Sequence, residues 1–147
     1  MRVAIDTNIL AYAEGVNGDA LKVQALTLIR RLANGTGVVP IQVLSELFQV
    51  LVRKARWDAD EARSAVLEWS DIFPLVETSQ PIVVGALELA TKHNFNIWDG
   101  IVLASAADGG CRFLLTEDLQ EGFMWRGVTV ANPFSKSPHP LLFDTLH

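Results

Sequence analysis

The chain alternates short apolar runs, which are typical of buried strands, with longer stretches in which apolar residues recur every three or four positions, as on amphipathic helices. The predicted strands are residues 2–6, 38–40, 72–76, 113–115 and 128–130. The predicted helical segments are residues 9–13, 20–33, 41–55, 58–70, 80–93 and 99–107. Strands that alternate with helices favour a parallel sheet covered by helices on both faces. The pattern therefore predicts an α/β fold with three layers, α/β/α, around a short-stranded and mostly parallel central sheet.

Two segments depart from the simple alternation. Residues 99–107 are apolar nearly all round, which indicates a helix buried on most sides. After residue 132 the chain carries three prolines and is expected to be irregular. We therefore expect one domain over residues 1–133 and an irregular, proline-containing tail over residues 134–147. The apolar residues 141–143 of this tail could dock on the domain or on a partner.

The composition narrows the function classes. Half of the 147 residues are hydrophobic and 20% are charged, so the chain can bury a core and is not expected to be disordered. Its net charge of -5 argues against a protein that holds nucleic acid mainly by bulk positive charge. It leaves a nuclease open, because a metal ion and a local basic rim can draw phosphate into an acidic pocket.

The predicted compartment is the cytoplasm. The single cysteine, Cys111, allows no internal disulfide, which fits a reducing compartment. The N-terminus begins with a strand pattern rather than with the charged and then apolar stretch of a signal peptide. No apolar run approaches the ~18 residues that a membrane span needs. We expect a soluble protein that has no membrane partner.

Four acidic residues stand where different predicted elements begin or end. Asp6 ends the first strand, Glu46 lies on the helix after the second, Asp99 opens the buried helix, and Asp118 follows the strand at 113–115. Because the carboxyl ends of parallel strands share one edge of a sheet, carboxylates placed there can converge. Converged carboxylates repel one another unless they are protonated or bind a cation. An acidic cleft of this kind suits Mg²⁺ or Mn²⁺.

Each of these acids also has a purely structural interpretation. Asp6 can cap the helical turn that follows it, and Asp99 can cap the helix that it opens, which is worth about 1 kcal/mol. Glu46 lies on a polar helical stripe that solvation alone explains. Asp118 and its neighbour Glu117 can occupy the first turn of a helix capped by the preceding threonine. Both interpretations stay open for each acid, and only the four together point to a site.

Few other residues indicate chemistry. Cys111 lacks a second cysteine or a histidine at ligand spacing, which argues against structural zinc. The chain contains no phosphate-binding glycine loop and no nucleophile elbow. Arg53, Lys54 and Arg56 form a tight basic cluster, either a solvated helix end or a rim that contacts phosphate. Trp98 is expected either to pack in the core or to line the cleft.

Four ordered motifs resemble the PIN domain family, in particular the toxin nucleases of VapBC-type toxin–antitoxin pairs. Residues 3–10 (VAIDTNIL) are similar to the opening motif of the family, and residues 45–47 (SEL) to its helix-borne glutamate. Residues 98–107 (WDGIVLASAA) are similar to its third motif and residues 114–119 (LLTEDL) to its last. The resemblance runs to about residue 133 and keeps the order of the family's motifs.

The resemblance implies a PIN-like fold and gives the acids their roles. Carried over by position, the catalytic and metal-binding set consists of Asp6, Glu46, Asp99 and Asp118. Glu117 adjoins Asp118 and either can serve as the fourth acid; Asp118, two residues after a threonine, is the expected one. The chain departs from the family at Gly100, where alanine is more common.

The activity that the resemblance implies is metal-dependent hydrolysis of RNA phosphodiester bonds, with Mg²⁺ or Mn²⁺ as the cofactor. Thr7, Asn8 and Thr116 are expected to hydrogen-bond the carboxylates or to position their loops. The protein would be the toxin of a toxin–antitoxin pair and a homodimer. Its antitoxin would insert a segment near the cleft.

Two other function classes stay open. One is a PIN-like module with little catalysis, which acts by binding RNA or a partner. The other is a phosphotransferase or a receiver-like domain, because Asp6 also ends a first strand in those folds. Phosphotransferases of the haloacid-dehalogenase type need a second aspartate two residues later, where this chain has Asn8. The lysine and phosphoacceptor pattern of a receiver is not clear either, so this class ranks last.

Overall fold

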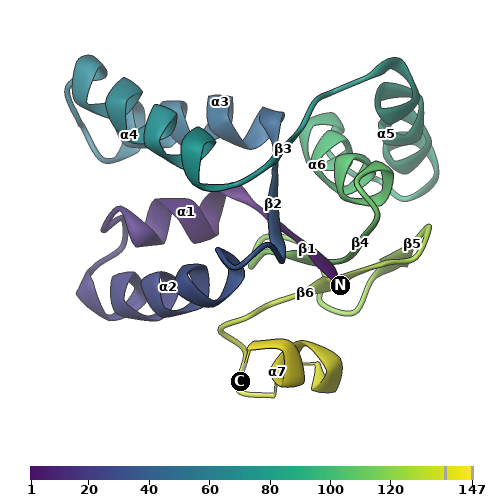
Figure 1. Ribbon diagram of the computed structural model, residues 1–147. Coiled ribbons are helices and arrows are strands. Elements are labelled where there is room, and N and C mark those ends of the chain that lie inside the picture. The colour runs from purple at the N-terminus through teal and green to yellow at the C-terminus, as the bar shows by residue number, and fades with distance from the viewer. Residues whose placement is uncertain (138, 147) are drawn as a thin grey trace.

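The central feature of the fold is a mostly parallel sheet (Figure 1). The computed structural model describes residues 1–137 and 139–146, and within them six strands pair in the order β3-β2-β1-β4-β6-β5. The strands are β1 (Arg2–Ile5), β2 (Gly37–Pro40), β3 (Leu75–Val76), β4 (Cys111–Leu115), β5 (Met124–Trp125) and β6 (Val128–Ala131). All neighbours in this part of the chain pair in parallel except β5 and β6. The predicted α/β class with short, mostly parallel strands is confirmed.

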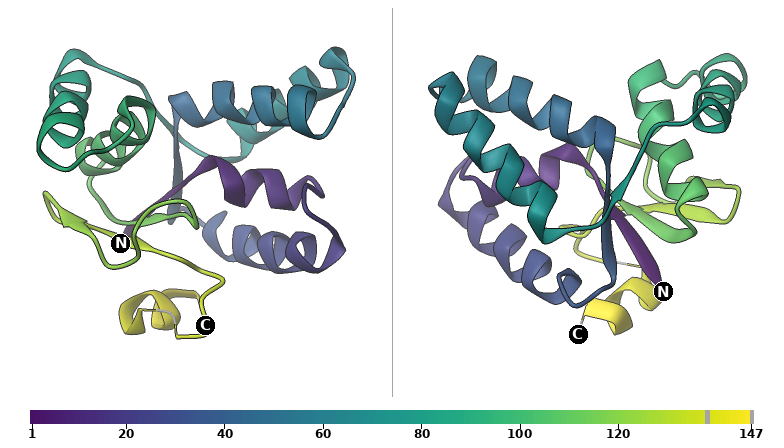
Figure 2. Two further views of the ribbon diagram at one scale, coloured as in Figure 1. Left: turned by 180° about the vertical axis from the view of Figure 1, so that it is seen from behind. Right: turned by 45° about the horizontal axis from the view of Figure 1, so that its top comes forward.

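Helices cover both faces of this sheet. They are α1 (Thr7–Ala13), α2 (Asp19–Leu32), α3 (Ile41–Gln49), the π-helical segment η1 (Val50–Lys54), α4 (Ala59–Ile72), α5 (Gln80–Lys92), α6 (Ile97–Asp108) and α7 (Pro140–Leu146). Helices α1 to α4 lie together on one side of the sheet, and α5 packs with α6 on the other (Figures 1 and 2). The predicted three layers are therefore present. Over the described ranges, no helix has the length and apolar character needed to cross a bilayer.

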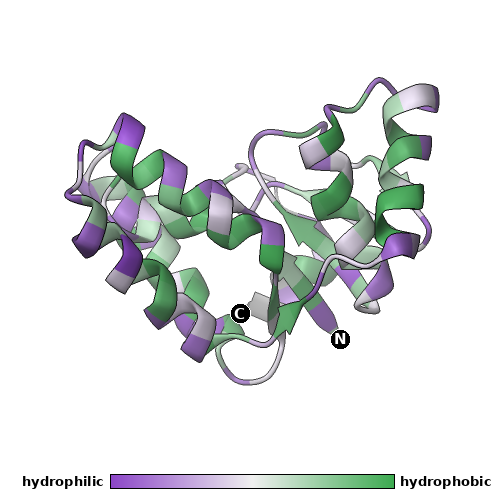
Figure 3. Ribbon diagram, turned by 90° about the horizontal axis from the view of Figure 1, so that it is seen from above, coloured by the Kyte–Doolittle hydropathy of each residue, from purple (hydrophilic) through white to green (hydrophobic). Residues whose placement is uncertain are grey.

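The order of the strands creates a switch point beside β1. The chain steps from β1 to β2 and β3 toward one edge, and then crosses back to β4 on the other side of β1. Right-handed crossovers that run in opposite directions place their helices on opposite faces of the sheet. The two groups of helices therefore diverge near the carboxyl ends of β1 and β4, as the view from above shows (Figure 3). Open α/β sheets hold their ligands at this kind of place.

Burial fixes the elements that border the switch point. Val3, Ala4 and Ile5 of β1 are fully buried, as are all residues of β4 except Arg112. Residues 100–106 of α6 are buried as well, which confirms a helix covered on most sides. Each large apolar side chain buried in this way contributes about 1.5–3 kcal/mol. The body of α6, just after the acid in its first turn, is thus held in the core.

Two predicted segments differ from the structure in their bounds. The strand predicted at residues 72–76 is wrong at its start, because Ile72 still belongs to α4 and only Leu75–Val76 pair with β2. The proline before this pair lacks an N–H group, and β3 lies at the sheet edge as a proline-containing strand should. The helix predicted at residues 41–55 changes after Gln49 from α-helical to π-helical winding.

Strand β5 was not predicted. It has two residues, too few for a periodic signal, and a tight turn at Arg126 and Gly127 joins it to β6. Both turn residues have positive φ, 46° and 83°. This is the backbone conformation that two-residue hairpin turns need.

The prediction of an irregular tail is wrong over residues 140–146, which form α7. Pro140 stands at the start of this helix, where its missing N–H leaves no bond unmade, and so the proline did not break the helix. Leu142 is fully buried, and α7 packs near α2, so the tail docks on the domain. The domain boundary after residue 133 stays a prediction. Outside the described part of the chain lie Pro138, His147 and the side chains of Phe143, Thr145 and Leu146.

Gly100 marks a close approach of α6 to α5. A Cβ atom on this residue would lie 3.1 Å from the backbone oxygen of Ala86 and 3.3 Å from its Cα, so a backbone would have to move. We expect Gly100→Ala to lower the free energy of unfolding by about 1 kcal/mol, because overpacking of about 1–3 kcal/mol exceeds a gain in helix propensity of about 1 kcal/mol. Urea unfolding measures the change.

The control for this prediction is the same substitution in an Ala86→Gly background. Removing the Ala86 Cβ, which would lie 3.3 Å from the new one, should reduce the cost of Gly100→Ala through a favourable coupling energy. A single variant as stable as the wild type would mean that the helices separate freely at this point.

Candidate functional site

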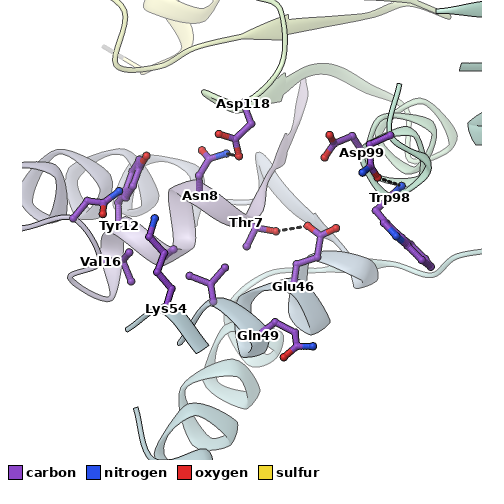
Figure 4. A pocket seen from close by; sticks show the side chains of 14 residues that line it. Thr7, Asn8, Tyr12, Val16, Glu46, Gln49, Lys54, Trp98, Asp99 and Asp118 are labelled. Atoms are coloured by element: carbon purple, nitrogen blue, oxygen red, sulfur yellow. Dashed lines mark hydrogen bonds between the residues drawn. The ribbon is translucent and has the colours of Figure 1, made fainter. Parts of the chain in front are cut away.

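A pocket of about 480 Å³ opens between the two groups of helices at the switch point. Its walls come from α1, α3 and η1 on one side, from the start of α6 on the other, and from the loop after β4 (Figure 4). Three of the four predicted acids line it: Glu46, Asp99 and Asp118. Asp6 is not among the lining residues and is buried, with 4% of its surface exposed.

Asp6 is both a helix cap and a buried acid. Its Oδ1 accepts a hydrogen bond of 2.7 Å from the N–H of Thr7, which makes it the N-cap of α1, and Thr116 hydrogen-bonds its side chain. Burial raises the pKa of Asp6 from 3.8 to about 7, against the lowering effect of these hydrogen bonds. The charges of Glu46 and Asp99 add to the rise. The structural interpretation of Asp6 as a helix cap is therefore confirmed, and its role in binding a metal stays a prediction.

Glu46 faces the pocket, so its interpretation as part of a solvated helix face is wrong. It lies on α3, and its Oε2 accepts a hydrogen bond of 2.7 Å from Thr7 Oγ1 (Figure 4). Burial raises the pKa of Glu46, the bonds from Thr7 and Gln42 lower it, and the charges of Asp99 and Asp118 raise it further. The carboxylate is thus held in place and lies within the electric field of two other acids.

Asp99 is not the cap of its helix. Helix α6 begins two residues earlier than predicted, and Asn96 caps it by accepting a 2.8 Å hydrogen bond from the N–H of Trp98. The carboxylate of Asp99 is left to line the pocket (Figure 4). Its pKa is raised by burial and then by the charge of Asp118. The interpretation of this acid as a cap is therefore wrong, although Asp99 still lies in the first turn of α6.

The loop after β4 turns one of its two acids into the pocket. Asn8 Nδ2 donates to Asp118 Oδ2 at 3.0 Å and to Thr116 Oγ1 at 2.9 Å, and the N–H of Asp118 donates to the same threonine oxygen. Glu117 instead accepts a hydrogen bond from Tyr12 Oη and does not line the pocket. No helix forms here, so neither acid lies in a helical first turn.

The acids of the pocket carry charge that the protein itself leaves uncompensated. Among the described residues the two salt bridges both involve Glu88 on α5, so none of the four acids is paired with a cationic side chain. The donors are all carboxylate oxygens, which suit a hard divalent cation. Within residues 1–137 and 139–146, however, no three acidic, histidine or cysteine side chains lie close enough to enclose a metal ion. A cation would have to draw the carboxylates inward as it binds.

The predicted supporting residues are in place, and others were missed. Thr7 holds Glu46, and Asn8 holds Asp118, as expected of them. Tyr12 lines the pocket without having been predicted to do so. A signal existed, because Tyr12 lies four residues after Asn8 and such residues share one face of a helix. The cap at residue 96 was also missed, because the helix was predicted to begin at Asp99, where the continuous apolar run starts.

The chain also matches a known protein family. A protein-family model described as PIN domain matches residues 3–120. No curated protein matches the chain.

Several solved structures share the fold. The chain is similar to a chain of VapBC2 from Rickettsia felis bound to a DNA fragment from their promoter, with 18% identity and a TM-score of 0.65, over 90% of this chain and 98% of that one. It is similar to VapC20 from Mycobacterium tuberculosis, a sarcin-ricin loop cleaving toxin, with 19% identity and a TM-score of 0.59. The match covers 76% of this chain and 86% of that one. The chain is also similar to a chain of a toxin–antitoxin complex from Klebsiella pneumoniae, with 20% identity and a TM-score of 0.65; the match covers 90% of this chain and 98% of that one.

The cap and the acid at the start of α6 can be separated by mutation. We expect Asn96→Ala to lower the free energy of unfolding by about 1 kcal/mol, because it removes the N-cap. Asp99→Asn should change it by less, since the lost interaction with the helix dipole, about 0.3–1 kcal/mol, is offset by relief of repulsion. Urea unfolding of both variants tests this. Equal destabilisation by the two substitutions would mean that Asp99 stabilises the start of α6 as much as its cap does.

Metal-free protein should lose stability as the pH rises toward neutrality. Between the ordinary pKa of 3.8 and the folded value of about 7, folded Asp6 binds more protons than the unfolded chain does. The free energy of unfolding therefore falls over this range, by up to about 4 kcal/mol. Asp6→Asn keeps an acceptor for the N–H of Thr7 and should remove most of the dependence.

Urea unfolding in chelator below and above this range measures the effect, with Asp108→Asn at the far end of α6 as the control. A wild type that becomes more stable over the same pH range would show that Asp6 ionises without penalty.

Proposed function

The chain belongs to the PIN domain family, and on that basis we propose that it is a metal-dependent endoribonuclease, a hydrolase of RNA phosphodiester bonds, and the toxin of a toxin–antitoxin pair. The similarity to VapC20, a sarcin-ricin loop cleaving toxin, supports the choice of RNA. The similarity to chains from VapBC2 and from a toxin–antitoxin complex supports the biological role.

The observation that carries this proposal is the set of acids at the switch point. Carboxylates from four separate parts of the chain lie at or beneath one pocket, and the charges of neighbouring acids raise the pKa of Asp6, Glu46 and Asp99. A stable protein keeps such repulsion only where something offsets it. A divalent cation with its phosphate substrate is the natural occupant of this place.

The residues that would hold the cation are Asp6, Glu46, Asp99 and Asp118. When bound, Mg²⁺ or Mn²⁺ supplies Lewis-acid chemistry, making water a better nucleophile and offsetting the charge that develops on the phosphate oxygens.

Other residues of this chain orient the carboxylates. The hydroxyl of Thr7 and the side chain of Gln42 hydrogen-bond Glu46, and Asn8 fixes one oxygen of Asp118. Because the pKa of Asp6 is raised to about 7, this acid is partly protonated near neutral pH and would release its proton when a cation binds. Metal affinity should accordingly rise with pH.

Two surfaces support the proposed protein partners. A groove of about 460 Å³ between α3 and α4 is lined by Leu44, Phe48, Val66 and Leu67, and an apolar segment of an antitoxin would fit there. On α5, Val84 and Leu87 are more than half exposed, which suits the interface of a homodimer. With RNA as substrate and a free cysteine, we place the protein in the cytoplasm.

A second candidate function is a PIN-like module that binds RNA or its partner with little catalysis. It is favoured by one observation, that no three ligating side chains lie close enough to enclose a metal ion within the described ranges. Metal binding separates the two functions, because the module needs no cation.

We expect chelator-stripped wild type to bind Mn²⁺ in calorimetry, and Asp6→Asn and Asp99→Asn to weaken the affinity by at least about tenfold, since each removes a ligand charge. Glu117→Gln is the matched control, because this acid adjoins Asp118 but does not line the pocket. It should bind Mn²⁺ as the wild type does.

Cleavage of RNA in Mg²⁺ should be weakened in Asp6→Asn and Asp99→Asn and unchanged in Glu117→Gln. Full metal-dependent cleavage by Asp99→Asn would overturn the assignment of this acid. Failure of the wild type to bind Mn²⁺, both alone and with an RNA oligonucleotide present, would favour the binding module.

A further inference from the structure

We propose that a single strand of RNA crosses the pocket with one base stacked on Trp98 and a backbone phosphate paired with Lys54. This inference rests on the proposed ribonuclease function and adds the path of the substrate to it. Two observations carry it, a lysine on one wall of the pocket and an exposed tryptophan on the other.

Lys54 is the member of the basic cluster that reaches the pocket. Of the three cations at residues 53–56, it alone lines the cavity (Figure 4). Arg53 Nε donates instead to Gln49 Oε1, at 3.1 Å. The ammonium group of Lys54 makes no salt bridge within the described part of the chain. A lysine that lines the same pocket as three acids and forms a salt bridge with none of them is available to an anion.

The π-helical segment explains why this lysine turns inward. In η1 the N–H of Ala55 donates to the carbonyl of Val50, five residues back, at 3.0 Å. In a continuous α-helix Lys54 would lie about 80° around the axis from Glu46. The wider π turn rotates the chain less per residue and so brings Lys54 back toward the line of Glu46. Such π turns occur often at functional sites.

Trp98 is the tryptophan that the fold leaves uncovered. Its side chain is 53% exposed and lines the pocket beside Asp99 (Figure 4). Trp69 and Trp125 are buried, and the indole N–H of Trp69 donates to Glu14. An indole face that is open to water next to an acidic site forgoes the burial that large aromatic side chains normally gain. It offers a flat surface on which a base can stack.

The two side chains lie on opposite walls of the pocket, and Glu46 lies between them. Lys54 comes from η1, in the group with α1 to α4, whereas Trp98 comes from α6, in the other group. In the close view Glu46 and Thr7 separate them (Figure 4). A strand that spans this gap would pass its backbone over the carboxylates. Only an unpaired base exposes a face for stacking, so the substrate would be single-stranded at this point.

The test measures the affinity of a short, fluorescein-labelled single-stranded RNA of mixed sequence by anisotropy, in Ca²⁺ in place of Mg²⁺, with the integrity of the RNA checked on a gel. We expect Trp98→Ala to weaken binding by about five- to a hundredfold, the range for one stacked base. Trp98→Phe should recover part of the loss, because it restores a smaller stacking surface.

Lys54→Gln should weaken binding several-fold and reduce the dependence of log affinity on log salt by about 0.7, the value for one phosphate contact on a single strand. Lys54→Arg should restore both. The matched control is Lys92→Gln, an exposed lysine of α5 outside the pocket, which should leave affinity and salt dependence unchanged. All variants should bind Mn²⁺ as the wild type does, which a general structural defect would prevent.

A separate readout follows Trp98 directly. Stacking should quench the tryptophan fluorescence of the wild type when RNA is added, and Trp98→Phe should abolish this quenching. If Trp98→Ala and Lys54→Gln both bind RNA as the Lys92→Gln control does while the wild type cleaves RNA, the inference is wrong and the proposed function stands. If these two variants keep RNA binding and lose only the binding of an antitoxin, Lys54 and Trp98 serve that partner and the inference is wrong. A wild type with no affinity for RNA would overturn both.

Discussion

The burial of one carboxylate at the end of the central strand is the constraint on which the rest of the site depends. β1 lies between β2 and β4, so Asp6 emerges at the middle of the sheet and is 4% exposed. Its hydrogen bonds to Thr7 and Thr116 tie it to α1 and to the loop after β4. The carboxylate cannot move away from Glu46 and Asp99 without breaking the helix cap, and so their repulsion is built into the fold.

If the proposed function is right, the same bond serves two purposes that usually compete. A helix cap favours an acid at the N-terminus of α1 because the helix dipole and the free N–H groups stabilise it. A cation site needs the same acid to be poorly compensated by the protein. Burial reconciles the two demands, since it leaves the cap bond intact while it raises the pKa of Asp6 to about 7. The acid stays where it is needed and remains short of positive charge.

The sequence predicted the layers, the mostly parallel sheet and the four acids because these depend on local signals: apolar runs, helical periodicity and charge at the ends of elements. It failed where the outcome depends on partners distant in the chain. Pattern alone could not tell that Asn96 caps α6 and frees Asp99, that Tyr12 holds Glu117 away from the pocket, or that Leu142 finds cover and lets α7 form. The roles of the acids in binding a cation remain a proposal that geometry supports.

The π-helical segment η1 has one residue more per turn than an α-helix would need, so it behaves as an insertion that the fold retains. The acid on α3 lies before this insertion and is unaffected by it, whereas every side chain that follows is turned to a new direction. A chain of this fold that lacked the extra residue would keep its carboxylates and present a different side chain on the facing wall. Helix length, independently of the acids, would then be a means by which related chains diversify what they recognise.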